Sequence, residues 1–209
     1  MKIPFWLSAV AVAVPPLVLA GVGMTHPTDL TAQSAEYWRN LHIGILPVFP
    51  LLGFAPWLLA RASGARRGVL WPVGVLGFLY AAFYTALDVL AGIGAGGLRL
   101  DDMGMAVGTL YGLGDSLGLI GSIALVAAAI VASITVFRAA GVGALPGALF
   151  VIVGSLLFLD DHIFFPVGVV GQLMLAIGWI ALLVALHRGA ATADRSAASS
   201  ADSRGATVA

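Results

Sequence analysis

The chain has 209 residues, of which 60% are hydrophobic and only 10% are charged, and its mean hydropathy is +1.04. Soluble domains carry about 25% charged residues, so this composition excludes an ordinary water-soluble fold. Ten basic and ten acidic residues balance, which leaves no electrostatic footprint for nucleic acid, and the absence of cysteine excludes disulfides and thiolate metal sites.

Six hydrophobic segments each contain a charge-free core of about 20 residues, the length that a helix needs to cross hydrocarbon. They predict an all-α integral membrane protein, with a six-transmembrane-helix bundle over residues 1–188. The approximate predicted spans are 3–25, 42–60, 68–90, 115–137, 143–162 and 167–187.

The first segment also resembles a cleavable signal peptide, with a Val-Leu-Ala cleavage site that ends at Ala20. The chain stays apolar beyond this site, and an even number of spans balances the charges on the two sides. We therefore favour a retained first helix.

The basic residues define the orientation. If the six segments alternate, one side carries Lys2, Arg61, Arg66, Arg67, Arg138, Arg188, Arg195 and Arg204, and the other side carries most of the acids. The positive-inside rule then places both termini in the cytoplasm of a multi-pass plasma-membrane protein. Residues 189–209 are small and polar and lack aromatic side chains, so they predict a disordered cytoplasmic tail.

Histidines and aspartates gather near the outer ends of the predicted spans. Counted from the basic ends at about 1.5 Å per residue, they lie at a similar depth, about 30 Å from the cytoplasmic boundary. This outer layer contains His42, Asp88, Asp115, Asp160, Asp161 and His162, with His26 just beyond the first span. Ionisable side chains at such a depth usually turn toward the bundle interior and pair with each other.

Helical spacing orients some of these side chains. Tyr80, Tyr84 and Asp88 recur every four residues, so they share one face of the third span. If the fifth span stays helical to its end, Asp160 points away from His162 by roughly 200 degrees, which leaves Asp161 as the better partner.

A metal site is one interpretation of this layer. Its ligands are His42, His162 and His26 with the carboxylates of Asp88 and Asp161, a mixed nitrogen and oxygen set that suits zinc, iron, manganese or copper. Such a metal would activate water, with Asp88, Asp160 or Asp161 as candidate catalytic carboxylates, and would act on a lipid or another apolar substrate.

Three alternatives remain open at this stage. The polar groups can cap helix ends at the membrane interface in a non-catalytic subunit that packs on a partner membrane protein or on a second copy. They can form a proton-linked ligand site, or His42 and His162 can bind a b-type haem. Whether the protein is an enzyme does not follow from the sequence, and the lipid bilayer is the partner that it predicts most directly.

Overall fold

The computed structural model describes residues 4–205, and these are helical with no strand. Within this described part of the chain, four stretches are long and apolar enough to cross a membrane: Phe5–Gly23, Arg67–Leu100, Gly104–Asp161 and Val167–Thr192. A fifth can form from Ala35–Ile45 with Val48–Ala62, a pair bent by 41°. The all-helical structure is confirmed, and its long apolar helices are compatible with a membrane bundle, while six crossings and the location of the termini stay predictions.

The first half of the bundle contains one broken helix. α1 (Phe5–Gly23) is followed by α2 (Ala35–Ile45), α3 (Val48–Leu52) and α4 (Phe54–Ala62). Because proline lacks an amide hydrogen, Pro47 interrupts the helical hydrogen bonds where α2 ends. α2 begins seven residues before the second predicted span, which starts at residue 42. It therefore includes Trp38, whose side chain is buried at 5% exposure.

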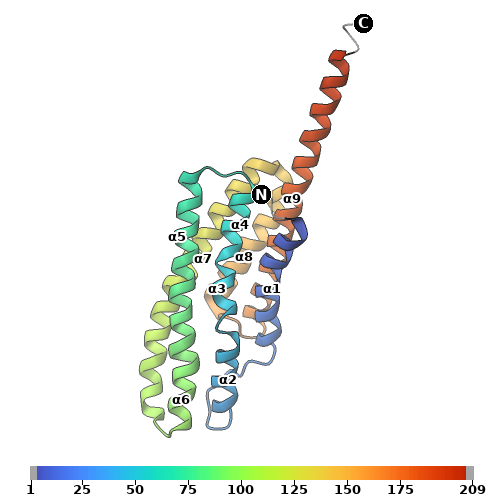
Figure 1. The fold of residues 1–209 in the computed structure, drawn as a ribbon. Coiled ribbons are helices and arrows are strands. Elements are labelled where there is room, and N and C mark those ends of the chain that lie inside the picture. Colours follow the sequence, from blue (N-terminus) through green and yellow to red (C-terminus); the bar gives the residue numbers. More distant parts are fainter. Residues whose placement is uncertain (1–3, 206–209) are drawn as a thin grey trace.

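The third segment is a long helix with a change of pitch. α5 (Arg67–Leu87) passes into the π-helix η1 (Asp88–Gly94) and then into α6 (Ala95–Leu100). The third predicted span ends at residue 90, but the chain remains helical beyond it as far as Leu100. In Figure 1 this helix runs to the lower end of the bundle, where the first part of α7 lies beside it.

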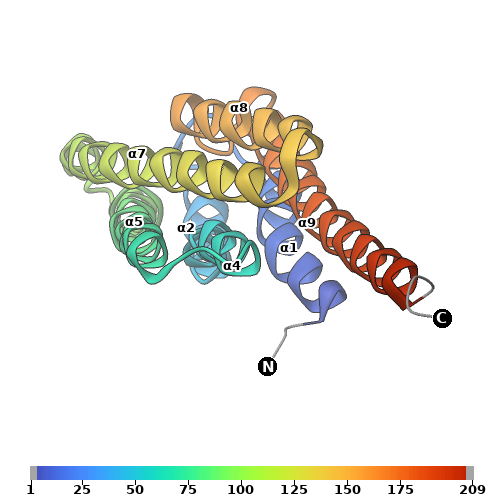
Figure 2. The same ribbon diagram turned by 90° about the horizontal axis from the view of Figure 1, so that it is seen from above.

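The second half contains three long helices. After the short turn η2 (Gly104–Ala106) come α7 (Val107–Ala140), the turn η3 (Gly141–Ala144), α8 (Leu145–Asp161) and α9 (Val167–Gly205). Gly141 has a φ of 66°, a conformation that glycine adopts without strain, and the chain reverses there. Seen from above, α7 lies between α8 on one side and α5 with α4 on the other (Figure 2).

The turns sort into two ends. α1 begins at the same end as the α4–α5 and α7–α8 turns, whereas the links after α1 and α8 lie toward the opposite end (Figure 1). The C-terminal part of α9 projects from the bundle as helix as far as Gly205, although the composition from residue 189 predicts disorder. The last four residues of that predicted tail lie outside the described residues.

Close backbone contact fixes the hairpin of α8 and α9. A Cβ atom added at Gly154 would lie 2.8 Å from the Gly171 carbonyl oxygen, and one added at Gly178 would lie 2.9 Å from that of Gly147. Small residues let two helices approach this closely. In a membrane the hydrophobic effect does not drive helices together, so close packing of this kind stabilises their association instead. The hairpin therefore holds the α8–α9 link, which carries His162, in a defined position.

Candidate metal centre

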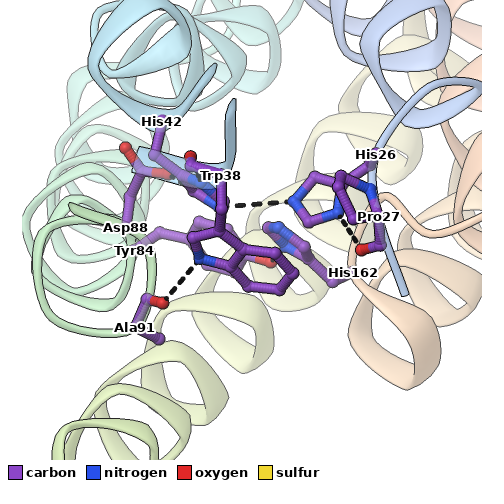
Figure 3. Close-up of polar contacts among 8 residues, drawn as sticks. All are labelled: His26, Pro27, Trp38, His42, Tyr84, Asp88, Ala91 and His162. Atoms are coloured by element: carbon purple, nitrogen blue, oxygen red, sulfur yellow. Dashed lines mark hydrogen bonds and ion pairs between the residues drawn. The ribbon is translucent and has the colours of Figure 1, made fainter. Parts of the chain in front are cut away.

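Three of the four histidines converge at one point of the bundle (Figure 3). His26 comes from the link after α1, His42 from α2 and His162 from the α8–α9 link, and one nitrogen of each lies within 4.8 Å of the others. His26 and His42 are 7% and 3% exposed, and His162 is partly buried. These three side chains could hold a metal ion.

The hydrogen bonds of His26 and His42 leave two lone pairs facing each other. Nδ1 of His26 lies 2.7 Å from the Pro27 carbonyl oxygen, and Nδ1 of His42 lies 2.7 Å from that of Trp38. A carbonyl only accepts, so each Nδ1 carries the hydrogen and each neutral ring keeps a lone pair on Nε2. The two Nε2 atoms are 3.4 Å apart with no hydrogen between them, which is a favourable arrangement only if a cation bridges them.

This distance matches the spacing of two ligands on one metal ion. Imidazole nitrogens bind zinc at about 2.0–2.1 Å, so two of them in a tetrahedral shell stand roughly 3.3–3.4 Å apart. Second hydrogen bonds from Nδ1 to carbonyls are also the usual way in which proteins orient metal-binding histidines. His26 and His42 thus have both the spacing and the orientation of a ligand pair.

His162 joins the pair through an unusual backbone conformation. α8 ends at Asp161, and His162 has a φ of 52°, which is uncommon for a residue with a side chain and marks local strain. Its Nδ1 forms a short hydrogen bond with the Tyr84 hydroxyl, and its ring stacks on those of Phe49 and Tyr84. Nε2 is therefore the His162 nitrogen that remains for a metal.

Asp88 lies beside the cluster but outside the group of three ligand nitrogens. One of its oxygens is 3.9 Å from His42 Nε2, the side chain is 0% exposed, and neither oxygen has a hydrogen-bond partner among the described residues. A bare carboxylate in such a place is costly unless a cation or a proton compensates it. Tyr80, Tyr84 and Asp88 are all buried, as their spacing predicts, but the Tyr84 hydroxyl bonds to His162.

The other predicted acids line a neighbouring cavity. Asp160 and Asp161 border a cavity of 410 Å³ together with His162, and neither belongs to the histidine group. Because the helix stops at Asp161, the expected angle between Asp160 and His162 does not apply. Asp115, which is not among the predicted ligands, borders this cavity and a second cavity of 220 Å³ that the three histidines line.

Glycines give the histidines their space. A Cβ atom at Gly92 would lie 2.3 Å from the His42 ring, and one at Gly168 would lie 2.6 Å from the His162 carbonyl oxygen. Gly92 belongs to the π-helix η1, whose Ala91 carbonyl accepts a hydrogen bond of 3.1 Å from Trp38 Nε1. π-helical turns occur frequently at functional sites, and this one joins α2 to the third segment beside His42.

Aromatic rings fill the space that a haem would need. His26 packs against Trp38 and Phe164 with ring centroids 4.7 Å away in each case, and its ring centroid lies 5.1 Å from that of His42. A haem with axial His42 and His162 requires a wide flat slot between these two rings. The arrangement therefore supports a single ion better than a haem.

We expect the metal-free protein to lose stability as the pH falls below about 6.5. Burial lowers the pKa of His26, although the Pro27 carbonyl opposes this, and burial and the neighbouring imidazoles lower the pKa of His162 further. The unfolded chain, with imidazole pKa values near 6.5, then binds more protons than the folded chain. Thermal unfolding from about pH 7.5 to about pH 5.5 measures this, and His26→Gln is expected to flatten the dependence.

The fold and the site together define a class: an all-helical bundle of membrane type with a buried cluster of three histidines at one end. Comparisons with known protein families, with curated proteins and with solved structures found no match.

Proposed function

We propose that the protein binds one transition-metal ion through His26, His42 and His162. The observation that carries this proposal is the pair of Nε2 lone pairs 3.4 Å apart, each fixed by a hydrogen bond from Nδ1 to a carbonyl. Three neutral imidazoles suit zinc, copper or iron better than manganese, which prefers oxygen. Three histidines with an open fourth position are one of the ligand sets of catalytic zinc sites.

The proposed setting is the plasma membrane, with six spans and both termini in the cytoplasm. The turns at the end where α1 begins carry Arg61, Arg66, Arg67 and Arg138, and the positive-inside rule assigns such an end to the cytoplasm. The metal would then lie near the outer face of the bilayer. A partner membrane protein or a second copy is compatible with this setting but has no specific support.

The proposed activity is metal-assisted hydrolysis of an apolar or lipid substrate. The 220 Å³ cavity at the histidines and the 410 Å³ cavity beside it share Leu87, Asp115, His162 and Phe164, so a substrate in the larger cavity would reach the metal. A metal ion in this position would lower the pKa of a bound water. Asp88 beside His42, or Asp115 at the junction of the cavities, would accept the proton.

Elemental analysis of the purified protein tests the proposal. We expect close to one metal ion per chain in the unaltered protein and a loss of metal in His26→Ala and in His42→Ala. His187→Ala is the matched control, because His187 contacts Phe5 in α1 and lies outside the histidine group. A metal-free protein that also takes up no zinc, copper or iron on titration would contradict the proposal.

A further inference from the structure

A second site lies between α4 and α5, away from the histidines. A Cβ atom at Gly77 would lie 2.4 Å from the Gly53 carbonyl oxygen, so the backbones touch at this pair. Toward the α4–α5 turn a groove of 610 Å³ lies between the two helices. A smaller groove of 300 Å³ adjoins the first one, and the two share Trp57, Gly74 and Phe78 as lining residues. The backbones that touch at Gly53 and Gly77 thus line the smaller part of a continuous apolar groove.

The walls of this groove are apolar and largely uncovered. Trp71 and Phe78 are 73% and 70% exposed, and Gly74 forms the floor beneath the Trp57 ring. From Arg67 to Phe78 the helix rises about 16 Å, close to half the thickness of a hydrocarbon core of about 30 Å. The groove therefore has the length of one leaflet.

The charge at the mouth of the groove has one sign. Arg67 lines the groove, and the Arg61 guanidinium lies 5.6 Å from the centroid of the Trp57 ring. These two arginines and Arg66 are exposed and form no ion pair with a described acid, and the sequence has no Asp or Glu between Glu36 and Asp88. A ligand here would meet uncompensated positive charge above an apolar channel.

We propose that this groove binds one anionic phospholipid, with its phosphate at Arg61 and Arg67 and an acyl chain along Gly74 and Phe78. Basic pockets beside membrane helices recognise anionic headgroups, and guanidinium groups bind phosphate oxygens in pairs. The apolar walls alone would accept any lipid chain. The arginines make the site selective for negative charge, and this selectivity does not depend on the metal centre.

Fluorescence quenching tests the proposal, because Trp57 and Trp71 lie in the groove. The full-length protein is placed in phosphatidylcholine vesicles that contain a small fraction of brominated phosphatidylglycerol or, in a parallel series, brominated phosphatidylcholine. The difference between the unaltered protein and Trp71→Phe isolates the signal of Trp71. We expect stronger quenching of Trp71 by the anionic lipid than by the zwitterionic lipid at equal fraction.

Two variants separate the headgroup contact from the groove. The double variant Arg61→Gln, Arg67→Gln removes exposed charges, and we expect the selectivity to fall roughly five-fold for each arginine lost. Arg138→Gln, at the same end but outside the groove, is expected to retain it. Gly74→Leu fills the floor and is expected to reduce quenching by both lipids.

Equal quenching of Trp71 by the two brominated lipids in the unaltered protein would overturn the proposal. Selectivity that survives intact in the double arginine variant would do the same. Retention of a monodisperse, helical protein in every variant ensures that a loss of quenching reports binding and not unfolding.

Discussion

Replacing Gly92 by alanine is expected to disrupt the histidine cluster without touching a histidine. The added Cβ would lie 2.3 Å from Cδ2 and 2.4 Å from Cγ of the His42 ring. The ring cannot turn away freely, because its Nδ1 donates to the Trp38 carbonyl oxygen. α2 and η1 must therefore separate, and overpacking of this kind costs about 1–3 kcal/mol in the free energy of unfolding.

Metal affinity is expected to fall together with stability in Gly92→Ala. A displaced His42 no longer keeps its Nε2 at 3.4 Å from that of His26, so one ligand of the pair is lost. Metal titration followed by thermal unfolding, with and without metal, measures both effects.

Gly97→Ala is the matched control for this prediction. Gly97 lies in the helix that directly continues η1, and a Cβ atom there would meet nothing within 4 Å. Alanine is favoured over glycine in a helix by about 1 kcal/mol, so the control is expected to be stable and to bind metal normally. If Gly92→Ala binds metal as tightly as Gly97→Ala, the packing of Gly92 does not position His42.

The composition and the charge-free segments were sufficient to predict a helical bundle of membrane type, because a bilayer admits few other ways of satisfying a backbone. The common depth of His42 and His162 also follows from a constant rise per residue, and the structure brings both together with His26. Depth along a helix is therefore a quantity that sequence alone can provide.

The direction in which a side chain points around the helix axis is harder to predict from sequence than its depth along the helix. The π-helix from Asp88 to Gly94 changes the angular position of every later residue around the helix axis. No residue in that run predicts a π-helix from the sequence. The positive φ of His162 likewise removes that side chain from the face that helical spacing assigns to it. A tertiary hydrogen bond lies at each irregularity, from Trp38 to the Ala91 carbonyl and between Tyr84 and His162.

Asp88→Asn is expected to change stability and metal affinity in opposite directions. Without metal, the Asp88 carboxyl is fully buried and has no hydrogen-bond partner among the described residues, so it needs a proton to avoid the cost of a buried charge. The neutral amide needs no such proton, so at alkaline pH, where the acid would ionise, the metal-free variant is expected to gain roughly 1–3 kcal/mol in the free energy of unfolding. With metal, the same carboxylate offsets the charge of the ion.

Loss of that offset is expected to weaken metal binding about 10–100-fold, the usual effect of removing a partner next to the ligand shell. The carboxylate oxygen lies 3.9 Å from His42 Nε2, close enough to interact with an ion held there. Metal titration and thermal unfolding of the same preparations give both quantities, with Asp161→Asn as the control because Asp161 is partly exposed and outside the histidine group.

The opposite signs make this variant more informative than a simple loss of function. A variant that is merely misfolded loses stability and metal binding together, and an interfacial carboxylate without a metal partner changes neither. If Asp88 is a buried acid whose charge a bound cation balances, its replacement raises the stability of the metal-free protein and lowers the metal affinity. If Asp88→Asn leaves the metal affinity equal to that of Asp161→Asn, the carboxylate does not act on the ion, and Asp115 becomes the acid to replace next.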